Sequence, residues 1–317
     1  GVAPFPQDLR AEHGFDNRGD HLSLSPLLME SFLKLSRSIV NSPDFNTKRC
    51  GIWKSFFLEP KKAPRAAVKA RLRGFLGRAF RRPVDQATLD RYTAYVHKQL
   101  AAGRRFTAAM KDVASGVICS PRFLYLRERG DKGGDDYDLA SRLSFFLWGS
   151  IPDKPLLDLA AAGKLGEPEI LGRQINRMLK DSRAQERSIQ FLSEWLNLNH
   201  LANLRPDKKH FPNWQPALAV DMRTETVAFF NEIVWKQKRP LSDLLNAQFT
   251  HLTPRLAKHY GLPVLEDDEG TLRYDLTKIP ARGGLLTQGG ILLANSDGEQ
   301  SHPIRRAVWL LDRVLGT

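Results

Sequence analysis

Amphipathic helical periods, interrupted by proline and glycine, follow one another along most of this chain. Residues 64–82 are a clear case, because Val68, Leu72 and Leu76 recur at helical spacing on one face. Pro83 ends this segment, since the residue before a proline resists the α region. A chain punctuated in this way can satisfy its backbone locally and favours a helical fold.

The other periodic segments continue this pattern. Asp85 is placed to cap one helix, and Gly261 to end another. Only residues 271–276 alternate, weakly, as a strand would. We predict an all-α, or mainly α, fold: a multi-helix orthogonal bundle with at most one or two short strands. Further helices are expected at 86–100, 106–118, 139–148, 156–162, 170–179, 189–198, 241–247, 254–260, 285–294 and 304–315.

A long helix is expected at residues 216–236, after a loop at 204–216 with spaced prolines. Its period of 3.6 residues assigns one side of the helix to the core. The residues expected to face inward are Val220, Thr224, Val227, Phe230 and Val234.

The length of 317 residues and a hydrophobic content of 42% are enough for a buried core and suggest about two domains. A polar, glycine-rich link at 129–136 marks a boundary. We divide the chain into the end of a truncated N-terminal domain at 1–47, a basic three-helix segment at 48–130, a central helical domain at 136–262 and a C-terminal helical segment at 263–317 packed on the central domain.

No apolar run approaches the roughly 18 residues needed to cross a bilayer. The first residues, GVAPFP, lack the basic start and apolar stretch of a signal peptide. We therefore expect no transmembrane segment and no signal peptide in this chain, which reads as a mature or excised segment.

Cysteine and histidine spacing argues against a metal centre. The two cysteines, Cys50 and Cys119, form no CxxC or CxxCH motif, and no histidine pair forms HExxH. Two buried thiols or one disulfide both fit the sequence. Asp16, Asn17 and Asp20 resemble part of a calcium loop, although an Asx-turn explains them more simply. We expect no metal and no cofactor within this chain.

The positive charge is concentrated in one region. Residues 48–129 hold 20 Lys and Arg against 5 Asp and Glu, a net of +15, whereas the whole chain is +13 and the remainder is therefore −2. Such asymmetry indicates an acidic partner. The candidates are nucleic acid, anionic lipid, a sulfated or carboxylated polysaccharide and an acidic neighbouring domain. Nucleic acid is the weaker candidate, because helix-turn-helix, zinc-finger and interleaved aromatic-basic motifs are missing. Solvated or domain-packing faces are the alternative. The predicted polyanion-binding residues are Lys69, Arg71, Arg73, Arg78, Arg81 and Arg82.

A second candidate site lies in the C-terminal part of the sequence. His251 and His259 flank a predicted helix, and the segment from Arg282 to His302 adds a cation and a third imidazole. Together they could line a cleft between helices with catalytic chemistry of unknown type. Structural, hydrogen-bonded roles for these histidines are the alternative.

A set of short strings, in a fixed order, resembles one group of proteins. The group is the large secreted planctomycete-type proteins made of tandem domains of unknown function. Each string is weak alone, but the ordered set covers nearly the whole chain. The strings are FP at 5–6, GFDN at 14–17, LSPLL at 24–28, RAFRRP at 78–83, SPRFLY at 120–125, LASRLSFFLW at 139–148, LTPRLAKHYG at 252–261, RGGLLTQ at 282–288 and SHPIRR at 301–306.

The resemblance implies an exported, periplasmic or extracellular, multi-domain protein. Many such proteins carry a c-type cytochrome motif outside the region matched here, and some carry modules that look sugar-binding. We therefore expect a non-catalytic helical module of an exported, cytochrome-associated protein, with its own flanking domains as partners and c-type haem in those flanks. The alternatives are an anionic-polysaccharide or envelope-binding module, and an enzyme with a helical-cleft site. Cys50 departs from the pattern, because a second nearby cysteine would be expected in relatives.

Overall fold

The computed structural model describes residues 25–61, 64–126, 134–265, 270–296, 298–299 and 302–316. The described chain forms two compact units, the first ending at Ala184 and the second beginning at Gln185. This division falls in helix α9 (Ser182–Trp195), inside the range 136–262 predicted as one domain. The calcium-type loop of Asp16, Asn17 and Asp20 lies outside the described residues.

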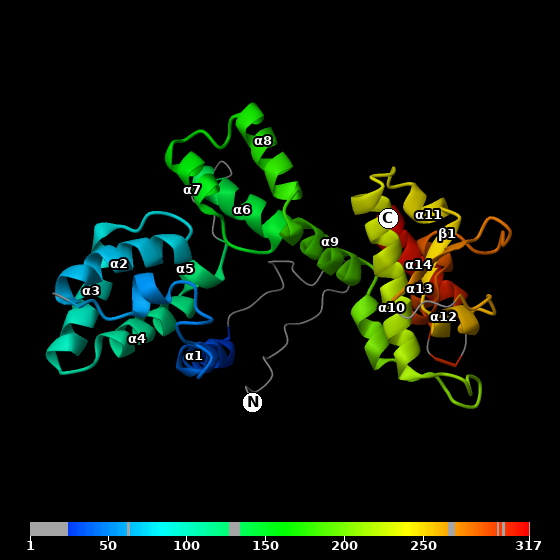
Figure 1. The fold of residues 1–317 in the computed structure, drawn as a ribbon, viewed down its shortest axis with the longest axis horizontal. Helices are drawn as coiled ribbons and strands as arrows, with labels where there is room; N and C mark the ends of the chain where they lie inside the picture. Colours follow the sequence, from blue (N-terminus) through cyan, green and yellow to red (C-terminus); the bar gives the residue numbers. More distant parts are fainter. Residues whose placement is uncertain are drawn as a thin grey trace. The chain divides into compact units, whose positions relative to one another are not determined.

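Helices dominate both units, and the described residues contain two short strands (Figure 1). The predicted mainly α fold is therefore confirmed. In the first unit, α2, α3 and α4 pack around a core that includes Phe57, Leu72, Leu76 and Met110. The first five helices and one π-helical turn are α1 (Pro26–Asn41), η1 (Trp53–Phe57), α2 (Pro64–Ala79), α3 (Gln86–Ala101), α4 (Phe106–Ile118) and α5 (Pro121–Leu124).

Local capping explains where these helices begin. The side chain of Asp85 accepts a hydrogen bond from the backbone N–H of Thr88, as predicted for the start of α3. Asp135 and Asp138 form a reciprocal capping box at the next long helix, and Gly149 ends it with a φ of 61°. The unit is completed by α6 (Asp136–Trp148), α7 (Lys154–Ala161) and α8 (Pro168–Leu179).

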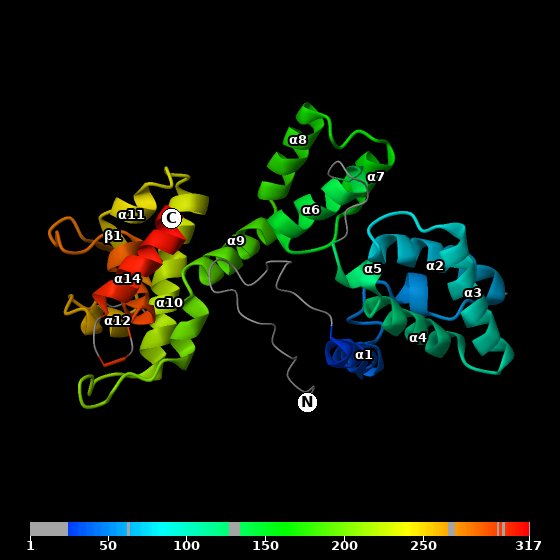
Figure 2. The same cartoon turned by 180° about the vertical axis from the view of Figure 1, so that it is seen from behind.

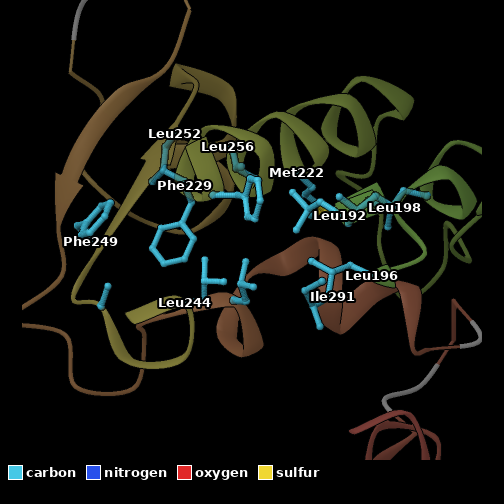
Figure 3. Packing of buried hydrophobic residues seen from close by; sticks show 14 of the residues in the cluster. Leu192, Leu196, Leu198, Met222, Phe229, Leu244, Phe249, Leu252, Leu256 and Ile291 are labelled. Atoms are coloured by element: carbon cyan, nitrogen blue, oxygen red, sulfur yellow. The ribbon is translucent and has the colours of Figure 1, made fainter. Parts of the chain in front are cut away.

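The second unit is built around α10 (Pro216–Asn231), which lies beside α12 when seen from either side (Figures 1 and 2). Leu192, Met222, Phe229 and Ile291 meet in its core (Figure 3). The other elements are η2 (Leu198–Asn203), η3 (Glu232–Lys236), α11 (Asp243–Asn246), β1 (Phe249–Leu252), α12 (Pro254–His259), β2 (Leu272–Asp275), η4 (Leu285–Thr287), α13 (Gly289–Ala294), α14 (Pro303–Leu310) and η5 (Leu311–Leu315).

The two strands pair antiparallel, with Phe249 opposite Asp275 and Leu252 opposite Leu272. The alternation at 271–276 correctly indicated β2. The sequence did not indicate β1, because all four of its residues are buried and the strand lacks an alternating polar face.

The predicted inward face is confirmed at Phe230, which is buried, and at Val227 and Val234, which pack against the core, but it is wrong at Val220 and Thr224, which are exposed. Val220 is 63% exposed, whereas Leu218, Met222 and Phe229 are buried together with the carboxylate residue Glu225. The helix contacts η2, β1, α12 and α13, so it is covered on several sides and has no single apolar stripe. A search for one stripe therefore passed over Glu225.

Both cysteines are free thiols and half-buried. The Sγ atom of Cys119 lies 3.1 Å from the hydroxyl of Ser36. No helix within the described ranges combines the length and the hydropathy that a membrane span requires.

Candidate functional site

The predicted polyanion-binding residues, which lie in α2 and directly after it, differ in what their side chains contact. Lys69 forms an ion pair with Asp90 at 2.8 Å. The guanidinium of Arg71 donates to the carbonyl oxygens of Phe56 and Leu58, and it lies over the ring of Phe106. These two cations therefore stabilise the first unit from within.

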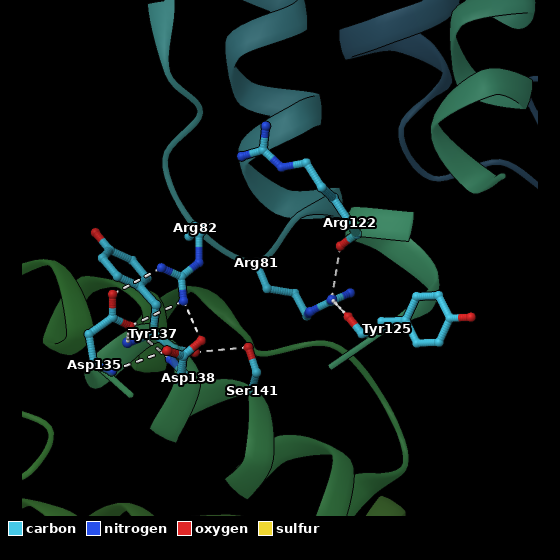
Figure 4. A network of polar contacts seen from close by, with 8 residues as sticks. All are labelled: Arg81, Arg82, Arg122, Tyr125, Asp135, Tyr137, Asp138 and Ser141. Atoms are coloured by element: carbon cyan, nitrogen blue, oxygen red, sulfur yellow. Dashed lines mark hydrogen bonds and ion pairs between the residues drawn. The ribbon is translucent and has the colours of Figure 1, made fainter. Parts of the chain in front are cut away.

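Arg81 and Arg82 are also engaged inside the protein (Figure 4). Arg81 is 5% exposed, and its guanidinium donates to the carbonyl oxygens of Arg122 (3.0 Å), Phe123 (2.9 Å) and Tyr125 (2.7 Å). These partners are neutral backbone oxygens. Burial lowers the pKa of Arg81, with a further contribution from the neighbouring charge of Arg82.

Arg82 forms ion pairs with two carboxylates at the start of α6. Its guanidinium lies 2.9 Å from Asp135 and also pairs with the buried Asp138. These are the two capping-box residues, so the arginine ties the end of α2 to the beginning of α6. Arg73 and Arg78 alone of the predicted set stay exposed without an ion pair in the described part of the chain.

The four residues of the predicted C-terminal cleft do not all come together. His251 lies in a buried cluster, where its Nε2–H donates to Glu232 at 2.5 Å, and Arg273 donates to the other carboxylate oxygen at 2.9 Å. Burial lowers the pKa of His251. Burial alone would raise the pKa of Glu232, but the bonds from Arg273 and His251 outweigh it and the pKa lies below its ordinary value. The hydrogen bonds of His251 and Arg273 to Glu232 hold these three side chains together in the buried cluster.

His302 precedes α14 as its N-cap residue and does not line the two cavities described next. His259 and Arg282, in contrast, line one cavity of about 560 Å³ in the second unit. A neighbouring cavity of about 450 Å³ shares Trp214 and His259 with it. We call these two cavities together the cleft.

The walls of the cleft combine aromatic rings with cations. The larger cavity is lined by Phe211, Trp214 and Tyr260, and the smaller one adds Lys258. The Arg282 guanidinium lies 3.9 Å from the centre of the Tyr260 ring. Among the described residues that line the cleft, none is Asp or Glu. Such a lining favours an anionic ligand with flat or apolar faces.

Arg282 is the cation best placed to meet a ligand. No carboxylate of the described residues lies within ion-pair distance of its guanidinium, whereas Arg255, on the wall of the smaller cavity, is paired with Asp221 at 2.5 Å. His210 is likewise hydrogen-bonded to Asp207 at 3.1 Å. Arg282 therefore lines the cleft without an ion-pair partner among the described residues, although its charge acts at longer range on the buried Glu225.

Tyr260 connects the cleft with a buried carboxyl group. Its hydroxyl donates to Glu225 at 2.6 Å and accepts from the backbone N–H of Gly289 at 2.7 Å. Thr250 donates to the second oxygen of Glu225, also at 2.6 Å. Glu225 is 1% exposed, and desolvation raises its pKa to about 7. Burial and the Glu225 charge together raise the pKa of Tyr260 well above its ordinary value.

Local turns hold these side chains in place. Gly261, with a φ of 70°, ends α12 directly after Tyr260, as the sequence predicted. Gly284 has a φ of 61°, and a Cβ there would lie 2.1 Å from the carbonyl oxygen of Leu245. Only glycine permits this approach, which fixes the backbone that carries Arg282. The N–H groups of Gly283 and Gly284 donate to protein oxygens, so they serve packing.

The loop at 204–216 forms the aromatic wall. The N–H of Asp207 donates to the carbonyl of Gly298, and the carbonyl of Asp207 accepts from the N–H of Phe211. The N–H of Trp214 then donates to Phe211. These bonds turn the proline-spaced segment back toward the helices, which is why its aromatic side chains line the cleft.

Sequence reasoning missed Glu225, Tyr260 and Trp214. The only signal for Tyr260 was its place in the LTPRLAKHYG string, and Glu225 was hidden by the wrong inward face of α10. No group of three His, Cys, Asp or Glu that could hold a metal ion occurs in the portion of the chain that the structure describes.

Three protein-family profiles match the chain in succession. Residues 2–42 match a Protein of unknown function (DUF1587), residues 67–128 match a Protein of unknown function (DUF1595), and residues 135–262 match a Protein of unknown function (DUF1592). No curated protein and no solved structure matches. With these three domains in this order, the chain has the tandem-domain pattern of the planctomycete-type multi-domain proteins.

Proposed function

We propose that the second unit binds a carboxylated or sulfated saccharide chain in the cleft. The observation that carries this proposal is Arg282, a cation without an ion-pair partner in the described chain, stacked on Tyr260 in a wall whose described residues include no Asp or Glu. A carboxylate or sulfate would take the place of the missing counter-ion.

The aromatic residues supply the second half of the recognition. Trp214 offers a flat apolar face, which suits the C–H faces of sugar rings. The two adjoining cavities meet at Trp214 and His259, and Lys258 lies beyond this meeting point. A linear polymer with repeated negative charges could occupy both cavities, with Arg282 and Lys258 at successive residues.

The wider setting of this role is proposed from the resemblance. Proteins with this domain pattern look exported and often carry c-type haem elsewhere. We place the cleft in such an exported, cytochrome-associated chain, where the helical module would hold glycan near the flanking domains. The experiment below tests the glycan part alone.

The test is retention on heparin and polygalacturonate columns in a salt gradient. Wild type should elute at moderate salt, and Arg282→Ala and Trp214→Ala should each elute much earlier. Arg73→Ala and Arg78→Ala are the matched controls, because they remove exposed arginines from α2, and they should shift elution only slightly. Equal elution of Arg282→Ala and Arg73→Ala would overturn the proposal, and a larger effect of Arg73→Ala would return the polyanion site to α2.

A further inference from the structure

We infer that the cleft cleaves a uronate-containing chain by β-elimination, with His259 as the base, Tyr260 as the acid and Arg282 as the counter-ion of the uronate carboxylate. This inference rests on the proposed function, because the same cleft must first bind an anionic saccharide. It adds a reaction, a substrate class and a role for each residue.

When Glu225 is protonated, the hydrogen bonds of Tyr260 allow its hydroxyl to donate a proton toward the cleft. A phenol hydroxyl can donate once and accept twice. With Glu225 ionised, the hydroxyl donates to Glu225 and accepts from Gly289. With Glu225 protonated, the carboxylic acid can donate along the same 2.6 Å contact, and the phenol proton is then released to point into the cavity that Tyr260 lines. The buried pair is thus a two-step proton relay.

His259 is the base available beside this acid. Its ring lies 6.0 Å from the Tyr260 ring, centre to centre, and both line the larger cavity. Partial burial lowers the pKa of His259, and the charge of Arg282 lowers it further. The imidazole is therefore neutral, and able to accept a proton, at neutral pH.

The absence of carboxylates from the cleft walls separates elimination from hydrolysis. Most glycosidases need two carboxyl groups on either side of the scissile bond. Within the described residues, no Asp or Glu lines the cleft, and Glu225 lies behind Tyr260. A cation, a neutral imidazole and a phenol instead match the needs of an elimination. These needs are stabilisation of charge on the carboxylate, removal of the α proton and protonation of the leaving oxygen.

The step balances without water. His259 takes the C5 proton of the uronate residue, and the electron pair of that C–H bond becomes the C4–C5 double bond. The C4–O bond breaks, and its electrons stay on the glycosidic oxygen, which takes the proton of Tyr260. Glu225 returns a proton to the tyrosinate, and solvent exchanges protons with His259 and Glu225 afterwards. One product carries an unsaturated uronate, and the other carries a hydroxyl group.

The charged groups around the relay predict its pH dependence. Glu225 contacts Tyr260 of α12 and Thr250 of β1, and the charge of Arg282 acts on it. The charge of Arg282 also acts on His259. His210, hydrogen-bonded to Asp207, lines the same cavity. The rate should rise as His259 loses its proton and fall above about pH 7 as Glu225 loses its proton. The profile should be a bell with its alkaline limb near neutrality.

The full chain is incubated with polygalacturonate, alginate and heparin, and the ultraviolet absorbance of the conjugated double bond is followed. Wild type should form unsaturated product from at least one polymer. Tyr260→Phe and His259→Ala should each lose roughly 100-fold or more of this rate while column retention changes less than about twofold. His259→Ala guards against misfolding, because His259 as a whole residue is largely exposed on α12. Glu225→Gln should be slower and should lose the alkaline limb.

The outcomes separate the inference from the proposed function. Retention on the columns without unsaturated product from any polymer overturns the elimination and leaves the binding proposal standing. If wild type is not retained on the columns and forms no unsaturated product, both the binding proposal and the elimination are overturned. If Tyr260→Phe and His259→Ala form product as fast as wild type, the assignment of these residues is overturned. Product that disappears in both variants, with retention kept, supports the inference.

Discussion

Arginines occur both in and directly after the basic helix α2 and in the cleft of the second unit. The two groups differ in whether protein oxygens bind their guanidinium groups. Arg81 and Arg82 donate to carbonyl oxygens and carboxylates of the first unit. Arg282 stacks on Tyr260 and has no carboxylate partner within the described ranges. The region with the highest charge density in the sequence therefore includes arginines that the fold engages, beside Arg73 and Arg78, which stay exposed.

The difference shows why net charge is a poor guide to a binding site. A guanidinium offers five donors, and a backbone that ends a helix offers unpaired carbonyl oxygens, so buried arginines find partners that a charge count ignores. Arg82 also reaches Asp135 and Asp138, which lie outside the basic region 48–129. A cation that binds a ligand is better identified by the absence of carboxylate partners in the folded protein than by its place in a basic stretch of sequence.

The largest expected effect in this comparison is on Arg81. Arg81→Ala should destabilise the first unit by roughly 3–5 kcal/mol, because three carbonyl oxygens lose a buried charged donor. Arg81 also has a φ of 61°, so Arg81→Gly relieves the backbone and should be about 1 kcal/mol less destabilising. Denaturant unfolding measures both. Arg282→Ala is the counterpart in the cleft, and a similar loss of stability there would contradict the comparison.

The second effect is the pH dependence that Glu225 gives to the second unit. Its pKa in the folded protein, about 7, lies above the ordinary 4.5, so the folded state holds the extra proton. The free energy of unfolding should therefore fall as the pH rises from about 4.5 to about 7, by up to about 3 kcal/mol, and stay level above that. Glu225→Gln cannot titrate and should flatten this slope. Urea midpoints at about pH 5 and about pH 8 give the difference, and parallel slopes for both proteins would refute the prediction.

Glycine replacements give the third contrast. A Cβ at Gly289 would lie 2.7 Å from the Tyr260 hydroxyl and 3.1 Å from Met222, so Gly289→Ala should cost about 1–3 kcal/mol. The same substitution at Gly74 of α2 meets nothing within 4 Å and should stabilise the helix by up to about 1 kcal/mol. Thermal unfolding of the two variants should move in opposite directions. A neutral Gly289→Ala would mean that Tyr260 is held loosely.

The smallest effect is expected at the exposed arginines of α2. Arg73→Ala and Arg78→Ala should change the free energy of unfolding by no more than about 0.5 kcal/mol, because neither guanidinium forms an ion pair in the described chain. Chemical denaturation measures each single variant beside Lys69→Ala. Lys69→Ala loses the ion pair with Asp90 and should therefore lose slightly more stability than the other two. A loss above about 1 kcal/mol at Arg73 would show that the exposed face of α2 also has a structural partner.

Much of the fold could be predicted from local patterns. The predicted helix that carries Phe106 and Ile118 is α4, Asp85 caps α3 and Gly261 ends α12, because helical period, capping oxygens and left-handed glycines act within a few residues. The inward face of α10 could not be predicted. Its surroundings on several sides come from β1, α12 and α13, which are distant in sequence.

The sequence by itself determined the helical class, most helix limits and the tandem-domain pattern, because each depends on short-range spacing or on ordered strings. Tertiary structure decided which charged groups have partners. It buried Arg81, paired His251 with Glu232, and placed Glu225 behind Tyr260 at the wall of a cavity with Arg282. The physical reason is that desolvation and hydrogen bonding depend on what a side chain meets in space, and no local pattern encodes those neighbours.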